Sequence, residues 1–431
     1  ILCCFSKSEM IKTVGRISVL PAFFGISEPA TFGLPMMLNP IFFIPCAFVP
    51  TINACIAYFC MNTNIIGKTY AMLSFNMPSV FGAFLSTGDV KALLLVVALL
   101  ILDMVLYYPF EMINLKCDCI EELINASQGY VDNDTVFKNI KILNVFTKEW
   151  ALAHVYIYKK WISHVEYDVD KPLMKCKNII DGNNLFLCPS FVDAHTHIES
   201  SLLTPANYAK LVIPHGTLTI LEDAHEVANV AGEKGLGYML SSAKDLPMRQ
   251  LLTVPSCVPS VPNYENSGAN FDYRIYEKFL DEKNVIGLGE VMDYEGVINN
   301  DERIGKILET ARRKNCYIQG HAPLVTGNRL SAYLCANIKS DHEARQVEEV
   351  VEKYRQGMWI DIRDANTNHN MPKIIQTLKK IGNYERVSFS SDDRRSDVIQ
   401  KKGHLDGIIR HAYSCGMPLT EAYISASYRP C

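Results

Sequence analysis

The first 115 residues of the chain contain very little charge. Ten Asp, Glu, Lys or Arg residues fall in positions 1–115, against 78 in the 316 positions that follow. Residues 29–67 contain no charged residue and no histidine, and residues 92–110 are apolar apart from Asp103 and Pro109. The second of these stretches has the length that a helix needs to cross the hydrocarbon core of a bilayer. We therefore predict membrane-spanning α-helices in the first part of the chain and a soluble protein in the rest.

Two further absences exclude other classes of protein. An excess of basic residues is missing, since the formal net charge is −4, so a broad surface for nucleic acid is not expected. The 14 cysteines form no Cys-x-x-Cys motif and no regular framework. Because a secreted disulfide scaffold would show such a framework, we expect free thiols and a reducing compartment.

Prolines recur every five residues in the charge-poor part, at positions 35, 40, 45 and 50. Prolines kink a helix, and kinked or broken helices are tolerated in lipid mainly where they line a cavity between protein segments. The alternative is a set of ordinary kinked spanning helices without a site. Glu28 precedes this stretch, and a carboxylate beside a membrane segment is costly unless it is paired or solvated. Glu28 is therefore a candidate site residue.

Several motifs of this part resemble a known membrane family. They are Gly25-Ile-Ser-Glu-Pro29, Phe32-Gly-Leu-Pro35, Leu38-Asn-Pro40, Pro50-Thr-Ile-Asn53-Ala and Phe84-Leu-Ser-Thr-Gly88. Over residues 15–115 the chain is similar to the C-terminal end of the membrane permease of the lactose/cellobiose phosphotransferase system. The resemblance implies that Glu28 belongs to a remnant of a sugar site and that the chain continues on the cytoplasmic side. Because the earlier helices of such a permease are not in the sequence, we do not expect transport.

Composition changes near residue 115, where we place the first domain boundary. Short β-branched and aromatic runs follow at 136–137, 140–143 and 155–158, separated by polar residues. This pattern predicts a small antiparallel sheet in a β domain over residues 116–188.

Strand-like runs alternate with helix-like stretches over the remaining residues, 189–431. Eight runs are expected as strands, at residues 191–197, 218–223, 251–255, 285–290, 317–321, 338–342, 358–363 and 386–392. Such alternation predicts a (β/α)₈ barrel of the TIM type, in which chemistry lies at the C-terminal ends of the strands.

Histidines and carboxylates follow these predicted strands. His195 and His197 are two residues apart, so on a strand they point to the same side and can bind one metal ion. A lone pair of this kind is as well explained by packed or solvent-facing histidines. The further histidines His321 and His342, each at the end of another predicted strand, favour a metal site.

Two carboxylates complete the candidate site. Glu290 ends the fourth predicted strand, where it can bridge two cations or, alternatively, form an ion pair at the barrel rim. Asp392 ends the eighth, where a carboxylate can ligate a metal and accept a proton from metal-bound water. These six residues predict a metal-dependent hydrolase.

Residues next to these clusters are candidates for contacting substrate or orienting the ligands, although each can equally form an ion pair at the rim. They are Glu199, His225, Glu226, Asp393 and Arg394. The other histidines, His215 and His404 among them, are interpreted as packing, turn or surface residues.

The same clusters resemble the adenine deaminase branch of the amidohydrolase superfamily over residues 118–430. Beyond Asp193-Ala-His195-Thr-His197, the matching motifs are His197-Ile-Glu-Ser-Ser201, Pro214-His-Gly-Thr217, His225-Glu-Val-Ala-Asn-Val230, Pro255-Ser-Cys-Val-Pro259, Gly287-Leu-Gly-Glu-Val-Met292, Gly320-His-Ala-Pro323, Ser340-Asp-His-Glu343 and Asp392-Asp-Arg394. The first motif alone would leave ring opening of a cyclic amide as an equal alternative.

The resemblance implies a binuclear site of manganese or iron. In it His195 and His197 would hold one metal, His321 and His342 the other, Glu290 would bridge them, and Asp392 would ligate and shuttle protons. The implied reaction is attack of hydroxide on C6 of adenine, with release of ammonia and hypoxanthine. A homo-oligomer is compatible with this reading. The His-x-Glu of the unrelated zinc deaminases occurs at His197 and Glu199, but their Pro-Cys-x-x-Cys does not.

The resemblance also has departures. Ser190 stands where the family has a glycine before the first metal strand, and the family continues beyond the position of Cys431. We therefore expect a truncated β-sandwich beside the barrel. Two alternatives stay open: an inactive, decayed fusion with a permease fragment, and another amidohydrolase that acts on a cyclic amide.

Overall fold

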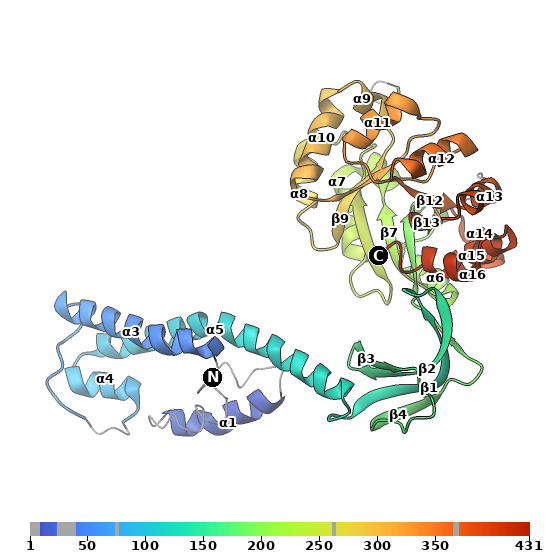
Figure 1. Cartoon of the computed structure of the whole chain (residues 1–431). Helices are drawn as coiled ribbons and strands as arrows, with labels where there is room; N and C mark the ends of the chain where they lie inside the picture. Colours follow the sequence, from blue (N-terminus) through green and yellow to red (C-terminus); the bar gives the residue numbers. More distant parts are fainter. Residues whose placement is uncertain (1–8, 24–39, 74–76, 261–263, 365–369) are drawn as a thin grey trace. The chain divides into compact units, whose positions relative to one another are not determined.

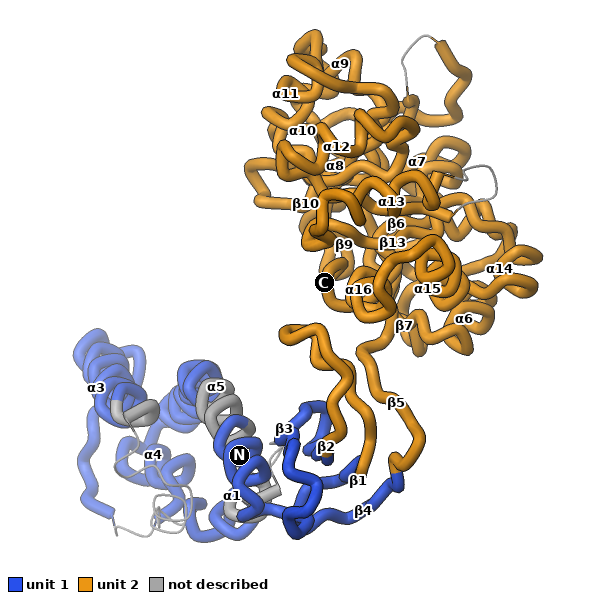
Figure 2. The backbone as a smooth tube through the Cα atoms, turned by 45° about the vertical axis from the view of Figure 1, so that its right-hand side comes forward, with its two compact units in different colours: residues 1–138, 154–181 blue, residues 139–153, 182–431 orange. Residues whose placement is uncertain are grey.

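The computed structural model describes residues 9–23, 40–73, 77–260, 264–364 and 370–431. Glu28 therefore lies outside the described residues. The chain forms two compact units, residues 1–138 with 154–181, and residues 139–153 with 182–431 (Figure 2). The two units are described separately below.

The charge-poor part of the first unit is helical, as predicted. Its helices are α1 (Glu9–Phe23), α3 (Pro40–Asn62), α4 (Ser79–Thr87) and α5 (Val90–Ser127) (Figure 1). Among the described residues, two segments are long and apolar enough to cross a membrane, Ile44–Asn62 and Val90–Phe110. The side chain of Asn53 on α3 donates a hydrogen bond of 2.8 Å to Asp103 on α5. The one charged side chain in the apolar stretch of α5 is thus paired across the two helices.

Helix α5 continues without interruption through residue 115, where the composition changes. Asp89 caps its N-terminus by accepting a hydrogen bond of 2.9 Å from the backbone of Lys91. Gly88, in the left-handed conformation at φ 67°, makes the tight connection from α4 to α5. The predicted boundary near 115 therefore lies inside a helix rather than in a linker.

The sheet of the small β domain is mixed, so the prediction of an antiparallel sheet was wrong in part. Its strands are β1 (Asn133–Asn144), β2 (Glu149–Tyr158), β3 (Trp161–Glu166), β4 (Cys176–Asp181) and β5 (Phe186–Leu187). β2 and β3 pair antiparallel, whereas β4 and β5 each pair parallel with β1. β4 runs parallel to β1 because the chain returns across the sheet between β3 and β4 and does not turn back in a hairpin.

The second unit contains the predicted barrel. Its eight strands are β6 (Phe191–Thr196), β7 (Thr217–Asp223), β8 (Arg249–Val254), β9 (Val285–Val291), β10 (Tyr317–Gly320), β11 (Ser340–Asp341), β12 (Trp359–Arg363) and β13 (Val387–Ser390). All neighbouring pairs are parallel, in the orders β10-β9-β8-β7-β6 and β11-β12-β13. Backbone hydrogen bonds of 3.0 Å from Asp392 to His195 and from Lys339 to Ile318 join the two sheets, so the strands form a ring.

Helices cover the outside of this ring (Figure 1). They are α6 (Pro205–Val212), α7 (His225–Ser242), α8 (Tyr273–Phe279), α9 (Tyr294–Ile298), α10 (Glu302–Arg313), α11 (Gly327–Cys335), α12 (Val347–Arg355), α13 (Met371–Ile381), α14 (Ser396–Lys402), α15 (Leu405–Ser414) and α16 (Leu419–Ser425), with short 3₁₀ turns η2 (Glu199–Ser201) and η3 (Ile213–His215). α10 illustrates how the apolar face of such a helix packs against the barrel. It buries Ile304, Ile307, Leu308 and Ala311, one face at helical spacing, against the core.

Candidate metal centre

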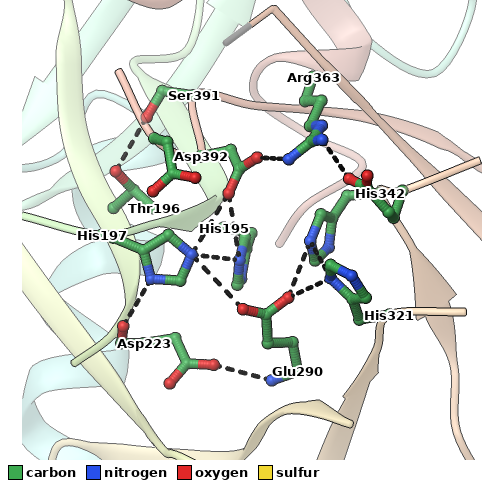
Figure 3. Close-up of polar contacts among 12 residues, drawn as sticks. His195, Thr196, His197, Asp223, Glu290, His321, His342, Arg363, Ser391 and Asp392 are labelled. Carbon is green, nitrogen blue, oxygen red and sulfur yellow. Dashed lines mark hydrogen bonds and ion pairs between the residues drawn. The ribbon is translucent and has the colours of Figure 1, made fainter. Parts of the chain in front are cut away.

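His195 and His197 approach the centre of the barrel from the end of β6. Every residue of β6 is buried, and the Nε2 atoms of the two histidines lie 3.0 Å apart (Figure 3). Their other nitrogens are held from outside, since Nδ1 of His197 lies 2.7 Å from the carbonyl oxygen of Asp223. Nδ1 of His195 lies 3.1 Å from Oε1 of Gln319, whose amide nitrogen donates to the carbonyl of Ala194. Partners of this kind fix the rings with Nε2 directed at the centre.

Asp392 joins these two histidines from the end of β13. Its Oδ1 lies 3.3 Å from Nε2 of His197 and 3.8 Å from Nε2 of His195. Its backbone is in the left-handed region at φ 51°, which an aspartate tolerates better than most residues. Ligand atoms of the three residues all lie within 4.8 Å of one another, so they can hold one metal ion.

Glu290 lies between these residues and a second pair of histidines. Its Oε2 lies 2.6 Å from Nδ1 of His321 and 3.0 Å from Nε2 of His342, while its Oε1 lies 3.7 Å from Nε2 of His197 (Figure 3). One oxygen therefore faces each histidine pair. This is the placement that a bridging carboxylate needs, and the six residues that the sequence singled out as ligands are brought together.

The charges of these groups depend strongly on one another. Burial opposes protonation of His197 and His342, but facing carboxylates raise the pKa of His197 well above its usual value and the pKa of His342 to about 9. Burial, together with the nearby His342 and His197, lowers the pKa of His195. The surrounding histidines hold the pKa values of Glu290 and Asp392 low despite burial. The carboxylates are thus ionised within a buried site.

The donor set fits a divalent first-row metal ion. Four imidazoles and two carboxylates suit manganese, iron or zinc, whereas magnesium and calcium prefer oxygen ligands. A divalent cation is therefore what this part of the described chain is suited to bind.

The structure adds residues that the sequence analysis did not single out. Arg363 is the last residue of β12 and its guanidinium contacts both Asp392 and Glu343 (Figure 3). Its position at the end of a predicted strand was the signal that could have found it. Asp223 likewise ends a predicted strand, whereas Gln319 lies at an interior position of β10, for which the sequence carries no pattern.

The candidates for substrate contact are divided. Oγ of Ser200 lies 2.9 Å from Oε1 of Glu226 and 2.6 Å from Oδ1 of Asp393, so its one hydrogen can be donated to either carboxylate. Nε2 of His225 lies 3.5 Å from Oε1 of Glu290, at the edge of the metal ligands. Glu226, Asp393 and His225 therefore lie next to one another on one side of the metal-ligand residues.

Two other candidates take part in local structure. Oε1 of Glu199 accepts a hydrogen bond of 3.3 Å from the backbone of Val227, near the start of α7. Arg394 is buried and donates at 2.8 Å to the backbone carbonyl of Asp364, and its guanidinium lies 3.6 Å from Oδ2 of the same residue as an ion pair. The structure places these two beside α7 and Asp364.

His404, interpreted from sequence as a packing residue, has a polar environment. It is fully buried, with Nδ1 2.8 Å from Oγ1 of Thr217 and Nε2 3.2 Å from Oδ2 of Asp193. Oδ1 of Asp193 accepts a hydrogen bond of 2.9 Å from the backbone of Ser391, next to Asp392. Asp193 thus connects β6 with the residues that follow β13, and His404 contacts its other carboxylate oxygen.

Known proteins match both parts of the chain. Residues 186–431 match the sequence profile described as "Amidohydrolase family", and residues 1–50 match the one described as "Phosphotransferase system, EIIC". The adenine deaminase of Clostridium acetobutylicum is 39% identical over 310 residues, which are 72% of this chain and 53% of that protein. The adenine deaminase of Thermosipho africanus is 37% identical over 302 residues, 69% of this chain and 51% of that protein. The chain thus spans about half the length of these relatives.

A solved structure confirms the fold independently. N-acetyl-D-glucosamine-6-phosphate deacetylase from Mycobacterium smegmatis aligns with a TM-score of 0.50 at 14% identity, over 69% of this chain and 89% of that chain. The amidohydrolase profile spans more than half of the sequence and includes every strand of the ring. The chain belongs to the amidohydrolase family.

Proposed function

We propose that the barrel deaminates adenine by hydrolysis, giving hypoxanthine and ammonia. The observation that carries the proposal is the position of Glu290 between two histidine pairs, in a chain whose relatives of 34–39% identity are named adenine deaminase. His195, His197 and Asp392 would hold one divalent cation, His321 and His342 the other, and Glu290 would bridge them. We propose manganese or iron as the pair.

A bound pair of divalent cations supplies hydroxide at neutral pH, because it lowers the pKa of water. Asp392 is suited to take up one proton of the attacking water and to pass it to the departing amine, so that ammonia leaves. The second proton of the water is transferred to N1 of the ring as the C6 carbonyl forms, which gives hypoxanthine. Arg363 contacts Oδ2 of Asp392, while Oδ1 faces the histidines. The arginine thereby fixes which oxygen points at the reacting centre.

Membrane attachment is the second part of the proposal. The phosphotransferase match over residues 1–50 and the apolar helices α3 and α5 support it. The placement of the barrel in the cytoplasm follows from the permease resemblance. We further propose three regions, a permease fragment over 1–115, a small β domain over 116–188 and the barrel over 189–431.

The test is ammonia release from adenine by the chain purified in detergent and loaded with Mn²⁺ or Fe²⁺. We expect turnover that is lost in His195→Ala, with Cys415→Ser, directly after the outer helix α15, as the control. A parallel assay with a cyclic amide such as dihydroorotate tests the nearest alternative, an amidohydrolase that opens a ring. Ring opening without ammonia would replace the proposed substrate class, and a folded, metal-loaded chain with neither activity would contradict the proposal.

A further inference from the structure

A second group of potential ligands lies against Glu290, on the side away from His321. It comes from three neighbouring strands: His225 and Glu226 follow β7, Cys257 follows β8, and Glu290 is in β9. One ligand atom each of His225, Cys257 and Glu290 lies within 4.8 Å of the other two. Nε2 of His225 also lies 3.7 Å from Oε2 of Glu226. Imidazole, thiol and carboxylate thus converge beside the proposed metal pair.

Negative charge accumulates around this group. Oδ1 of Asp223 and Oε2 of Glu226 are buried and have no hydrogen-bond partner among the described residues. In the part of the chain that the structure describes, no lysine or arginine forms an ion pair with Asp223 or Glu226. Buried acceptors without partners are costly, so a cation beside them would be stabilised.

Cys257 decides what kind of cation fits. The side chain is buried, 1% exposed, with its thiol among the ligand atoms of His225 and Glu290. A metal ion deprotonates a coordinating thiol. Sulfur, imidazole and carboxylate are ligands that Zn²⁺ and Co²⁺ accept together, whereas Mn²⁺ prefers oxygen and nitrogen.

We propose that His225, Cys257 and Glu290, with Glu226 as a fourth donor, form a third cation site that takes a thiophilic divalent ion such as Zn²⁺ or Co²⁺. Binding replaces the thiol proton, which is released to solvent, and creates a metal–thiolate bond. The ion would draw Oε1 of Glu290 away from His197 and so weaken the bridge. Excess zinc would therefore inhibit the enzyme, a consequence that rests on the proposed function, whereas the binding itself does not.

The binding is tested with Co²⁺, because thiolate ligation gives an intense charge-transfer absorption in the near ultraviolet that nitrogen and oxygen ligands do not. The manganese-loaded chain is titrated with Co²⁺ while the total bound metal is counted. We expect a third bound equivalent together with this absorption. Cys257→Ser should lose both while it keeps two bound metals, and Cys316→Ser, which changes another partly buried thiol, should keep all three. Absence of the absorption in the unaltered chain, or its persistence in Cys257→Ser, overturns the proposal.

Two further measurements separate this site from the proposed reaction. His225→Ala should weaken Co²⁺ binding at least tenfold and leave two metals bound, which would show that the imidazole belongs to the same site. Where adenine turnover is present, Zn²⁺ inhibition should shift to at least tenfold higher concentration in Cys257→Ser. A chain that binds the third ion yet never turns over adenine would support the cation site and contradict only the reaction. Inhibition that is unchanged in Cys257→Ser would contradict the inhibitory role.

Discussion

The helices α10 and α5 differ in how their apolar residues are arranged around the helix axis. α10 in the barrel unit has a single apolar face, which is buried, and charged residues on its other side. The segment Val90–Phe110 of α5, in the first unit, is apolar on all sides apart from Lys91 and Asp103, and its Leu94, Ile101 and Val105 are 60–64% exposed. A helix with one apolar face is stabilised by packing on a sheet, whereas one that is apolar all round needs either a protein core or lipid. The periodicity of the apolar residues, more than their number, separates the barrel helix from the candidate membrane helix.

The polar residues show the same contrast. In the barrel, buried charges converge from different strands on one site, while in the helices the charge of Asp103 is met by one amide from Asn53. The first arrangement serves chemistry and the second holds two helices together. Perturbing each in turn should therefore affect one unit and leave the other unchanged.

The largest effect is expected from Asp392→Asn, which keeps the shape of the side chain but removes the proton acceptor. If Asp392 moves the proton, kcat for ammonia release should fall about 10²–10⁴-fold. Steady-state kinetics at saturating Mn²⁺ measure this, with metal content determined in parallel. Asp397→Asn, a matched change in an exposed ion pair of α14, should leave kcat within about twofold, as surface changes commonly do. An Asp392→Asn enzyme with unaltered kcat would exclude the proton-transfer role.

Lys353→Met tests the stability of the barrel separately from its chemistry. Lys353 is fully buried and donates to Asp341 at 2.9 Å and to the carbonyl of Ala322 at 2.6 Å, with Glu349 as a third partner. Removing the ammonium leaves two buried carboxylates uncompensated, which should cost about 3–5 kcal/mol of unfolding free energy. Urea unfolding followed by tryptophan fluorescence measures the change. Lys306→Met, in an exposed pair on α10, is the control and should change stability by less than about 0.5 kcal/mol.

His404→Leu asks whether the Asp193–His404 pair positions the metal ligands. Loss of the hydrogen-bonding ring should loosen the contact between β6 and the residues after β13, and metal affinity should fall about 10–100-fold, as it does when outer partners of ligands are removed. Calorimetric titration with Mn²⁺ measures this. His411→Leu, in α15, which begins directly after His404, is the matched control because this histidine is 37% exposed. A lower free energy of unfolding in His404→Leu, with unchanged Mn²⁺ affinity, would indicate a purely structural role.

Much of the barrel could be predicted from sequence because most of its strands end in a recognisable polar cluster. The ligands His195, Glu290 and Asp392 stand at such ends, so their convergence followed from the topology alone. His404 could not be assigned, since its partners Thr217 and Asp193 are distant in sequence and only the closed ring brings them together. The parallel pairing of β4 with β1 was missed for a related reason. Hydrophobic runs show where strands lie but not the direction of a long connection.

Asp406→Asn isolates a pH effect on the barrel alone. Asp406 lies 3.3 Å from His215 and accepts a hydrogen bond of 2.8 Å from the backbone of His404. Burial opposes ionisation, but His215 and Arg410 outweigh it and lower the pKa of Asp406 below its ordinary value of 3.8. A lowered pKa means that the stabilisation is complete above pH 3.8 and is lost as the pH falls further. The unaltered chain should therefore lose more stability on acidification than Asp406→Asn.

Asn53→Ala should have the smallest effect, and it tests the first unit. The change removes the hydrogen bond to Asp103. Such bonds between membrane helices contribute about 0.6 kcal/mol on average, and at most about 2 kcal/mol. Thermal unfolding of the helices in detergent should shift slightly downward, while metal content and adenine turnover of the barrel stay constant. Asn62→Ala, at the C-terminal end of α3, is the matched control. A loss of metal from the barrel in Asn53→Ala would contradict the independence of the two units, because the hydrogen bond removed lies between α3 and α5.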